Sequence, residues 1–184
     1  MGGSIVGKNG VTFVKQNTGK LTVNGSFVSD TLRVEGGSLA LNGEGNSFNH
    51  VELAGAEEGG VLDINRNTVM GDLTDSGEGA ALNIGSGASL SVNGASSLSS
   101  STIQGSGTLT LRDTLEISGT ASLQGGVLLD LAKDDDSTGT LDLGSTSGST
   151  VSGIGGEGTL KSAGGVLTVN TGNSGGGSVF SGTL

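Results

Sequence analysis

A short unit, Gly-x-Leu-x-aliphatic, recurs along this chain at intervals of about 20 residues. In each copy a glycine precedes residues whose apolar side chains occupy every second position, which is the period of a β-strand. The unit is clearest between residues 152 and 170, where it occurs twice. A fixed period in this range is typical of solenoid proteins. The leucines of the unit are Leu21, Leu39, Leu62, Leu82, Leu90, Leu109, Leu128 or Leu129, Leu141, Leu160 and Leu167.

A second series of short apolar segments lies between these units, so that each period holds two or three strands. Its members are Phe13-Val14, Leu32-Arg33-Val34, Val51-Glu52-Leu53 and Leu115-Glu116-Ile117. Two architectures fit such spacing, a parallel β-helix and an antiparallel sandwich or barrel. The dipeptides Asn24-Gly25, Asn42-Gly43 and Asn93-Gly94 are of the kind that forms hairpins and favour the sandwich. The regular period and the similarity of the units favour the β-helix.

The sequence therefore predicts an all-β, right-handed parallel β-helix of about nine coils of roughly 20 residues. Leucines about 20 positions apart would stack on one another inside the coil, and Asn and Gly would supply left-handed conformations at its corners. No linker or change of composition divides the chain, so we expect one domain over residues 1–184. Residues 1–4 are compatible with an expression leader. Residues 54–60 and 132–138 are expected to form loops, the latter protruding.

Composition supports a long, thin core rather than a round one. Glycine contributes 38 of the 184 residues, and proline, cysteine, tryptophan and tyrosine are absent. Only four Phe remain, so the core must be built from Leu, Val, Ile and Ala. Collagen is excluded because it requires glycine at every third position. Disorder is disfavoured because hydrophobic residues make up 32% of the chain and are patterned.

Charge argues against two classes of partner. The net charge is −10, and the eight basic residues are scattered, whereas nucleic-acid binding needs concentrated positive charge. The same net charge opposes an anionic membrane surface. No apolar run approaches the roughly 20 residues of a membrane helix, and there is no signal-peptide pattern. If the protein is exported, we expect the chain to be part of a longer precursor.

Several residues are candidate sites, and each has a simpler interpretation. Asp134-Asp135-Asp136 offers carboxylates to a hard cation, but it fits a solvated loop. His50 is the only histidine, so it cannot form a histidine metal cluster. Residues 153–158 match G-x-G-x-x-G, yet no helix is expected after them to bind phosphate.

Two acidic pairs and one N-glycosylation sequon are further candidate sites. Glu57 with Glu58, and Asp72 with Asp75, are candidate glycosidase carboxylates, but aromatic platforms for sugars are missing. Asn24-Gly25-Ser26 fits the N-glycosylation pattern and is better explained as a turn. The sequence thus selects no catalytic, cofactor-binding or metal-binding residue, and it predicts a protein that is not an enzyme and needs no cofactor.

The last 34 residues resemble the autotransporter-associated β-strand repeat, whose pattern is roughly G-x-G-x-L-x-K-x-G-x-G-x-L-x-L. Residues 179–184, VFSGTL, are similar to the phrase that opens a further copy, and residues 103–119 match in part. Ala163 departs from the pattern, where the family has glycine. The matching positions are Gly156, Gly158, Leu160, Lys161, Gly165, Leu167 and Val169.

The resemblance implies a secreted passenger segment displayed on the surface of a Gram-negative bacterium. It would act as a stalk or adhesin linked to virulence, with a host-cell surface, a glycan or another copy as partner. Such passengers are exported by a C-terminal outer-membrane β-barrel, which this sequence does not contain. The family brings no catalytic residues.

Three other functions stay open. One is a carbohydrate-active β-helix enzyme, which would need acidic side chains gathered in one groove. Another is a phage or surface-layer β-solenoid. The third is an ice-binding face, for which Thr108, Thr110, Thr159 and Thr168 are suggestive. Thr22, Ala40 and Asp63 occupy comparable places without the regularity that such a face needs.

Overall fold

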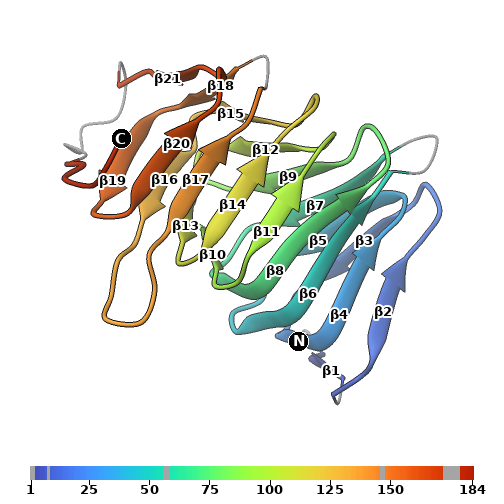
Figure 1. The fold of residues 1–184 in the computed structure, drawn as a ribbon. Helices are drawn as coiled ribbons and strands as arrows, with labels where there is room; N and C mark the ends of the chain where they lie inside the picture. The colour runs from blue at the N-terminus through green and yellow to red at the C-terminus, as the bar shows by residue number, and fades with distance from the viewer. Residues whose placement is uncertain (1–2, 8, 56–58, 146–147, 172–178) are drawn as a thin grey trace.

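The computed structural model describes residues 3–7, 9–55, 59–145, 148–171 and 179–184, and within them it contains strands and no helix. The chain winds into a solenoid whose strands lie side by side along a rod, with its first and last coils at opposite ends (Figure 1). No helix in the described part of the chain is long and apolar enough to cross a membrane. Every pairing between the described strands is parallel, so the predicted parallel β-helix is confirmed and the antiparallel sandwich is wrong.

The strands form three rows along the rod, here named faces 1, 2 and 3. Faces 1 and 2 belong to one 13-stranded sheet and share the long strands β4, β6 and β8. Face 1 contains β1 (Ile5–Val6), the first halves of β4 (Phe27–Val34), β6 (Asn46–Ala54) and β8 (Thr68–Ser76), and then β10 (Ser89–Val92), β13 (Thr108–Leu111), β16 (Leu128–Leu131) and β19 (Gly153–Gly156).

Face 2 continues from the same long strands. It contains β2 (Thr12–Lys15), the second halves of β4, β6 and β8, and then β11 (Ser96–Leu98), β14 (Thr114–Ile117), β17 (Thr140–Leu143) and β20 (Thr159–Ser162). Face 3 contains β3 (Lys20–Val23), β5 (Gly37–Leu41), β7 (Gly60–Ile64), β9 (Ala81–Ile84), β12 (Thr102–Gly105), β15 (Ser122–Gly125), β18 (Ser149–Val151) and β21 (Leu167–Val169). The first six form one sheet, and β18 and β21 form a separate two-stranded sheet.

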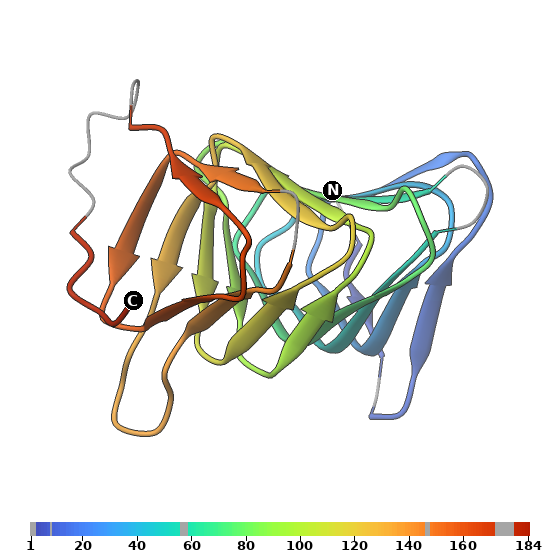
Figure 2. The same cartoon turned by 45° about the horizontal axis from the view of Figure 1, so that its top comes forward.

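The strands that the structure describes make eight complete coils, close to the nine predicted. A ninth coil is begun by Phe180, which bridges Gly156, and by Thr183, which bridges Thr159. Figure 2 shows the coils enclosing a common interior. The inward side chains form that interior, which is almost entirely aliphatic. Burying apolar surface contributes about 25 cal/mol per Å², so each added coil extends the same source of stability.

The leucine ladders exist, but the leucines of the repeated unit belong to three of them. Leu21, Leu39, Leu62 and Leu82 stack on face 3. The next three, Leu90, Leu109 and Leu129, stack on face 1. Leu141 and Leu160 stack on face 2, and Leu167 returns to face 3. The short interval between Leu82 and Leu90 is therefore a change of face and not a short coil.

A break in the two-residue period separates faces 1 and 2 within the long strands. In β4, Phe27 and Ser29 are buried and so are Leu32 and Val34, whereas the intervening Asp30 and Thr31 are half-buried. Two successive residues thus point away from the interior, and the inward set shifts by one position. Because side chains alternate strictly in a regular strand, this shift marks the bend between the two faces.

The Asn-Gly dipeptides lie at corners between stacked coils and not in hairpins. Asn42 donates from Nδ2 to Asn24 Oδ1 at 3.1 Å, and Asn65 donates to Asn42 Oδ1 at 2.8 Å. A Cβ on Gly43 would collide with the carbonyl of Gly25, so glycine permits the close stacking of these corners. The predicted corner position of Asn and Gly is confirmed here, but the predicted left-handed conformation is not found at Asn42 or Gly43. A positive φ occurs instead at the nearby Gly45 (φ 75°).

Candidate functional site

Any functional site must be formed by the outward side chains, because the interior is filled with hydrophobic side chains. On face 3 a row of polar side chains is joined along the rod. Asn83 Nδ2 donates to Asp63 Oδ1 at 2.7 Å, and Gln104 Nε2 donates to Asn83 Oδ1 at 2.8 Å. Ser38 Oγ donates to Asp63 Oδ2 at 3.0 Å. Parallel, in-register stacking places like side chains next to one another, and this row results.

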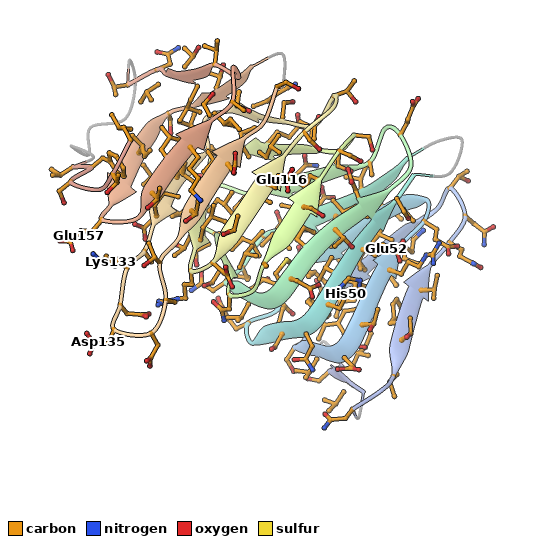
Figure 3. The ribbon with its side chains drawn as sticks, viewed as in Figure 1. His50, Glu52, Glu116, Lys133, Asp135 and Glu157 are labelled. Atoms are coloured by element: carbon orange, nitrogen blue, oxygen red, sulfur yellow. The ribbon has the colours of Figure 1, made fainter. Side chains whose placement is uncertain are left out.

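Face 2 carries most of the paired charges in the first half of the rod. Arg33 Nε lies 2.9 Å from Glu35 Oε1, and Arg33 Nη1 lies 3.4 Å from Glu52 Oε2. Glu52 also accepts a hydrogen bond from the Ser76 hydroxyl. These residues come from neighbouring strands of one face, as Figure 3 shows for Glu52 on β6. They bind successive coils to one another, although exposed ion pairs contribute only about 0–1 kcal/mol each.

His50 stands beside Asp72 on face 2, and Nδ1 of the imidazole contacts the Asp72 carboxylate. The residue on the other side of His50 in the register is Thr31. No group of three or more His, Cys, Asp or Glu residues that could hold a metal is found within the described ranges. The pair is therefore a contact between adjacent strands on an open surface.

Asp75 occupies a position in the inward column between Leu53 and Leu98, where an aliphatic residue is expected. Its carboxylate accepts hydrogen bonds from the backbone N–H groups of Ser99, Ser100 and Ser101 at 2.7–2.8 Å. Burial alone raises the pKa of Asp75, but these hydrogen bonds outweigh it, and the pKa lies below its ordinary value of 3.8. Asp75 thus ties the corner after β11 to the coil before it.

Asp72 and Asp75, the candidate glycosidase pair, do not face one another. Asp72 lies in an outward column with His50, whereas Asp75 turns toward the corner at residues 99–101. The other candidate pair, Glu57 and Glu58, lies outside the described residues. Asp72 and Asp75 therefore do not form the facing pair that a glycosidase needs. Of the four Phe side chains, Phe27 and Phe48 are buried, and Phe13 and Phe180 are partly buried against the core.

Lys15 is a second charged residue in an inward column, and sequence reasoning missed it. It occupies the position below Val34, and its side chain is 7% exposed. Its Nζ donates to the carbonyls of Gln16, Asn17 and Gly36 at 2.8–2.9 Å. Three carbonyl acceptors match the three donors of an ammonium group, so the buried charge is satisfied. Lys15 therefore closes a corner of the first coils and is not part of a binding surface.

The loop at residues 132–139 protrudes between β16 and β17, as predicted (Figure 1). Asp134 is used to shape it, since Oδ1 accepts the Ser137 N–H at 2.9 Å and the Ser137 hydroxyl at 2.7 Å. Arg112 Nη1 lies 2.9 Å from Asp134 Oδ2. The Ser137 hydroxyl is the main cause that holds the pKa of Asp134 below its ordinary value. Asp134 is thus occupied by the loop itself, and Figure 3 shows Asp135 at the tip, in solvent.

The G-x-G-x-x-G match at residues 153–158 does not form a phosphate loop. It covers β19 and the turn after it, and β20 follows instead of a helix. Gly156 has φ +92°, and a Cβ on Gly158 would collide with the carbonyl of Gly139. These glycines serve the corner of the eighth coil, where backbones of successive coils approach closely.

The threonines considered for an ice-binding face do not share one face. Thr108 and Thr110 are on face 1, Thr159 is on face 2 and Thr168 is on face 3. The structure does align Thr114, Thr140 and Thr159 in one column on face 2, but Thr140 is buried there. That column adjoins the charged residues Glu116, Asp142 and Lys161, so no flat neutral threonine surface results.

The chain matches no protein-family model, no curated protein and no solved structure at a significant level. Its established property is its architecture, a parallel β-solenoid. Its outer surface carries regular rows of side chains, to which each coil contributes one residue. The described residues form no enclosed catalytic or metal-binding site.

Proposed function

We propose that this chain is a structural β-helical segment of a surface-displayed autotransporter passenger, serving as a stalk or as an adhesin. The observation that carries the proposal is the stack of eight coils that the described strands form around one aliphatic interior. Such a stack is long and stiff because each coil bonds to both neighbours, and it presents repeated polar rows to solvent. Both properties suit a molecule that holds or attaches something at a distance from a cell.

The positions that resemble the autotransporter-associated repeat have physical roles in the last coil. Leu160 and Leu167 are inward positions that pack against the core. Gly158 is required because a Cβ there would strike the carbonyl of Gly139. The pattern of glycines and alternate leucines is therefore the pattern of a coil corner followed by a strand. This supports the resemblance at the level of the repeat, and the passenger function remains our proposal.

Display on bacteria tests the proposal. The chain is fused to a surface carrier, and attachment to host cells and clumping of the bacteria are measured against the carrier alone. An epitope placed before the chain reports, through a bulky antibody, how far the segment extends from the cell. If the chain is an adhesin, we expect it to increase attachment or clumping. If it is a stalk, we expect it to increase only the access of the antibody to the epitope. A chain that changes none of the three would contradict the proposal.

A further inference from the structure

The outward surface of face 1 carries almost no charge. One outward column runs along the rod from β1 to β16 and consists of Val6, Val28, Ser47, Val69, Ser91, Thr110 and Asp130. The corresponding column of face 2 holds the charged residues Arg33, Glu52, Glu116, Asp142 and Lys161. Face 3 carries Asp63 and the amides joined to it. In a protein of net charge −10, face 1 is therefore the side that a second copy approaches with least repulsion.

The neighbouring outward column of face 1 is uncharged as well. Ser89, Thr108 and Leu128 are in register there, and Ser89 Oγ donates to Asn67 Oδ1 at 3.0 Å. Most side chains of the two columns are Ser, Thr or Val. Because these side chains are short, a second sheet can approach to the roughly 10 Å at which sheets pack face to face.

Val69 lies near the middle of this face, and its side chain is 43% exposed. Its neighbours in the register are Ser47 and Ser91. Within the described part of the chain, the other large hydrophobic residues of comparable exposure lie in the first coil, in the last coil or beyond it. A single exposed valine is ordinary on a monomer, but a valine at the centre of an uncharged sheet face can form the core of a contact between two sheets.

The size of the face fits a weak dimer. Strands β1 to β16 of this face, spaced about 4.8 Å apart and about four residues of about 3.3 Å wide, cover about 34 by 13 Å. Two such faces bury about 900 Å² together, close to the lower limit of about 1,000 Å² for a specific interface. We therefore expect a reversible association with a dissociation constant in the micromolar range or above.

The charges of the two halves of the rod select the orientation. Residues 1–36 contain four basic and two acidic residues, a net charge of +2, whereas residues 128–184 contain two basic and six acidic residues, a net charge of −4. Antiparallel rods place the basic part of each copy beside the acidic part of the other. Parallel rods would place like charges together, so the antiparallel arrangement is favoured.

We propose that two copies of this chain pair through face 1, with their rods antiparallel and with Val69 of each copy near the two-fold axis. β4 and β6 of one copy then lie opposite β13 and β10 of the other. Asp130 stays at the margin, opposite the first coil. Because both copies use the same surface, the interface closes on itself and the assembly stops at a dimer. This association goes beyond the proposed function, since it concerns the chain in solution and does not require display on a cell.

Analytical ultracentrifugation of the full chain between about 1 μM and 1 mM tests the proposal. We expect the average mass to rise with concentration toward twice that of one chain. Val69→Glu brings two like charges together at the two-fold axis and should weaken the association about tenfold or more. The matched control is Val14→Glu, because Val14 is 40% exposed and lies on face 2 beside Arg33. Circular dichroism checks that both variants are folded.

The control should leave the association unchanged. A chain that stays monomeric over the whole range would overturn the proposal, without bearing on whether the displayed chain acts as a stalk or adhesin. Equal weakening by Val69→Glu and Val14→Glu would also overturn it, because the added charge would then act wherever it is placed.

Cross-linking of single-cysteine variants tests the orientation, because the chain contains no cysteine. Val28→Cys on β4 and Thr110→Cys on β13 are treated with a short bismaleimide, each alone and as a mixture. Antiparallel rods bring residue 28 of one copy opposite residue 110 of the other, so the mixture should give several-fold more covalent dimer than either variant alone. Stronger cross-linking of each variant with itself would mean parallel rods and would overturn the arrangement. A mixture of Val28→Cys with Ser97→Cys, which is exposed on face 2, sets the background, and a yield no higher than this would also overturn the proposal.

Discussion

The second to fourth coils and the fifth to eighth coils build the same solenoid by different means. In the earlier coils β4, β6 and β8 run for eight or nine residues through the bend between faces 1 and 2. In the later coils two strands of three or four residues replace each long strand. A short turn lies between the two, except between β16 and β17, where the loop at residues 132–139 lies. A bend within a strand keeps the hydrogen bonds between neighbouring coils continuous. A turn between two strands interrupts them and is a place where extra residues can be inserted.

The inward columns differ between these regions as well. On face 1 the earlier coils place the polar Asn46 and Thr68 in the interior, and the later coils place Leu90, Leu109 and Leu129 there. Asn46 is satisfied, because Oδ1 accepts the Phe27 N–H at 3.0 Å and Nδ2 donates to the Gly43 carbonyl at 2.7 Å. On face 1 the earlier coils therefore use side chains to satisfy their corners and the later coils rely on aliphatic packing. On the other faces the later coils keep buried polar side chains, since Ser96 Oγ accepts the Leu73 N–H and Ser149 Oγ accepts the Leu123 N–H.

The largest expected effect comes from exchanging these two interiors. Leu109→Asn buries an amide among leucines with no corner groups to bind, so we expect a loss of about 3 kcal/mol or more in the free energy of unfolding. Asn46→Leu leaves the Phe27 N–H and the Gly43 carbonyl without their partner, and we expect a loss of about 1–3 kcal/mol. Urea unfolding, followed by circular dichroism, measures both. Equal tolerance of asparagine at residue 109 would mean that the two interiors do not differ.

A smaller effect is expected at Asp75, where the two regions meet. Because its pKa is lower in the folded protein than the ordinary 3.8, its stabilising effect is present above pH 3.8 and is lost as the pH falls toward the folded value. Asp75→Asn should lower the stability at neutral pH by about 1–2 kcal/mol, a figure reduced for partial exposure. The variant should also lose part of the acid dependence, measured as unfolding midpoints between neutral and acid pH. Asp135→Asn, on the exposed loop, is the control and should change neither.

The smallest effects concern surface charge, which the two regions also arrange differently. In the earlier coils Arg33 pairs with Glu35 and Glu52, whereas in the later coils Glu116 and Asp142 lie side by side in register. Arg33→Ala should destabilise by up to about 1 kcal/mol, and Glu116→Gln should stabilise by a similar amount because it removes a like-charge neighbour. Both changes should shrink as salt is added, which thermal unfolding can follow. A salt-independent effect of Glu116→Gln would contradict this explanation.

The sequence was sufficient for the architecture because the leucine period reports directly on the length of a coil. It was not sufficient to assign strands to faces. Leu82 and Leu90 look like successive members of one leucine series, although they lie on different faces. At each bend two successive residues point outward, and the sequence alone does not show where this happens. The Asn-Gly pairs misled because the dipeptide is typical of hairpin turns, whereas here it stands at coil corners in which neither residue has a positive φ. The contact of Asn24 with Asn42, 18 residues away, and the parallel pairing of the strands before them identify the corner.

The charged inward residues could not be found for a related reason. Lys15 and Asp75 follow the strand period as an aliphatic residue would, yet each is held by backbone groups of the adjoining corner. A sequence pattern shows that a polar residue falls at an inward position, and such a residue normally argues against a buried strand. The compensating acceptors of Lys15 include Gly36, and the donors to Asp75 lie at residues 99–101, so neither partner set is local.

The loop at residues 132–139 shows how such a rod can vary while its core stays the same. It enters and leaves at the corner between β16 and β17, and Gly139 N–H donates to the Ala132 carbonyl at 2.6 Å, which clamps its base. Everything beyond that clamp is outside the stack. Foreign peptides grafted at this point would therefore project from the rod. The loop sequence can change without any change in the strands and the core that support it.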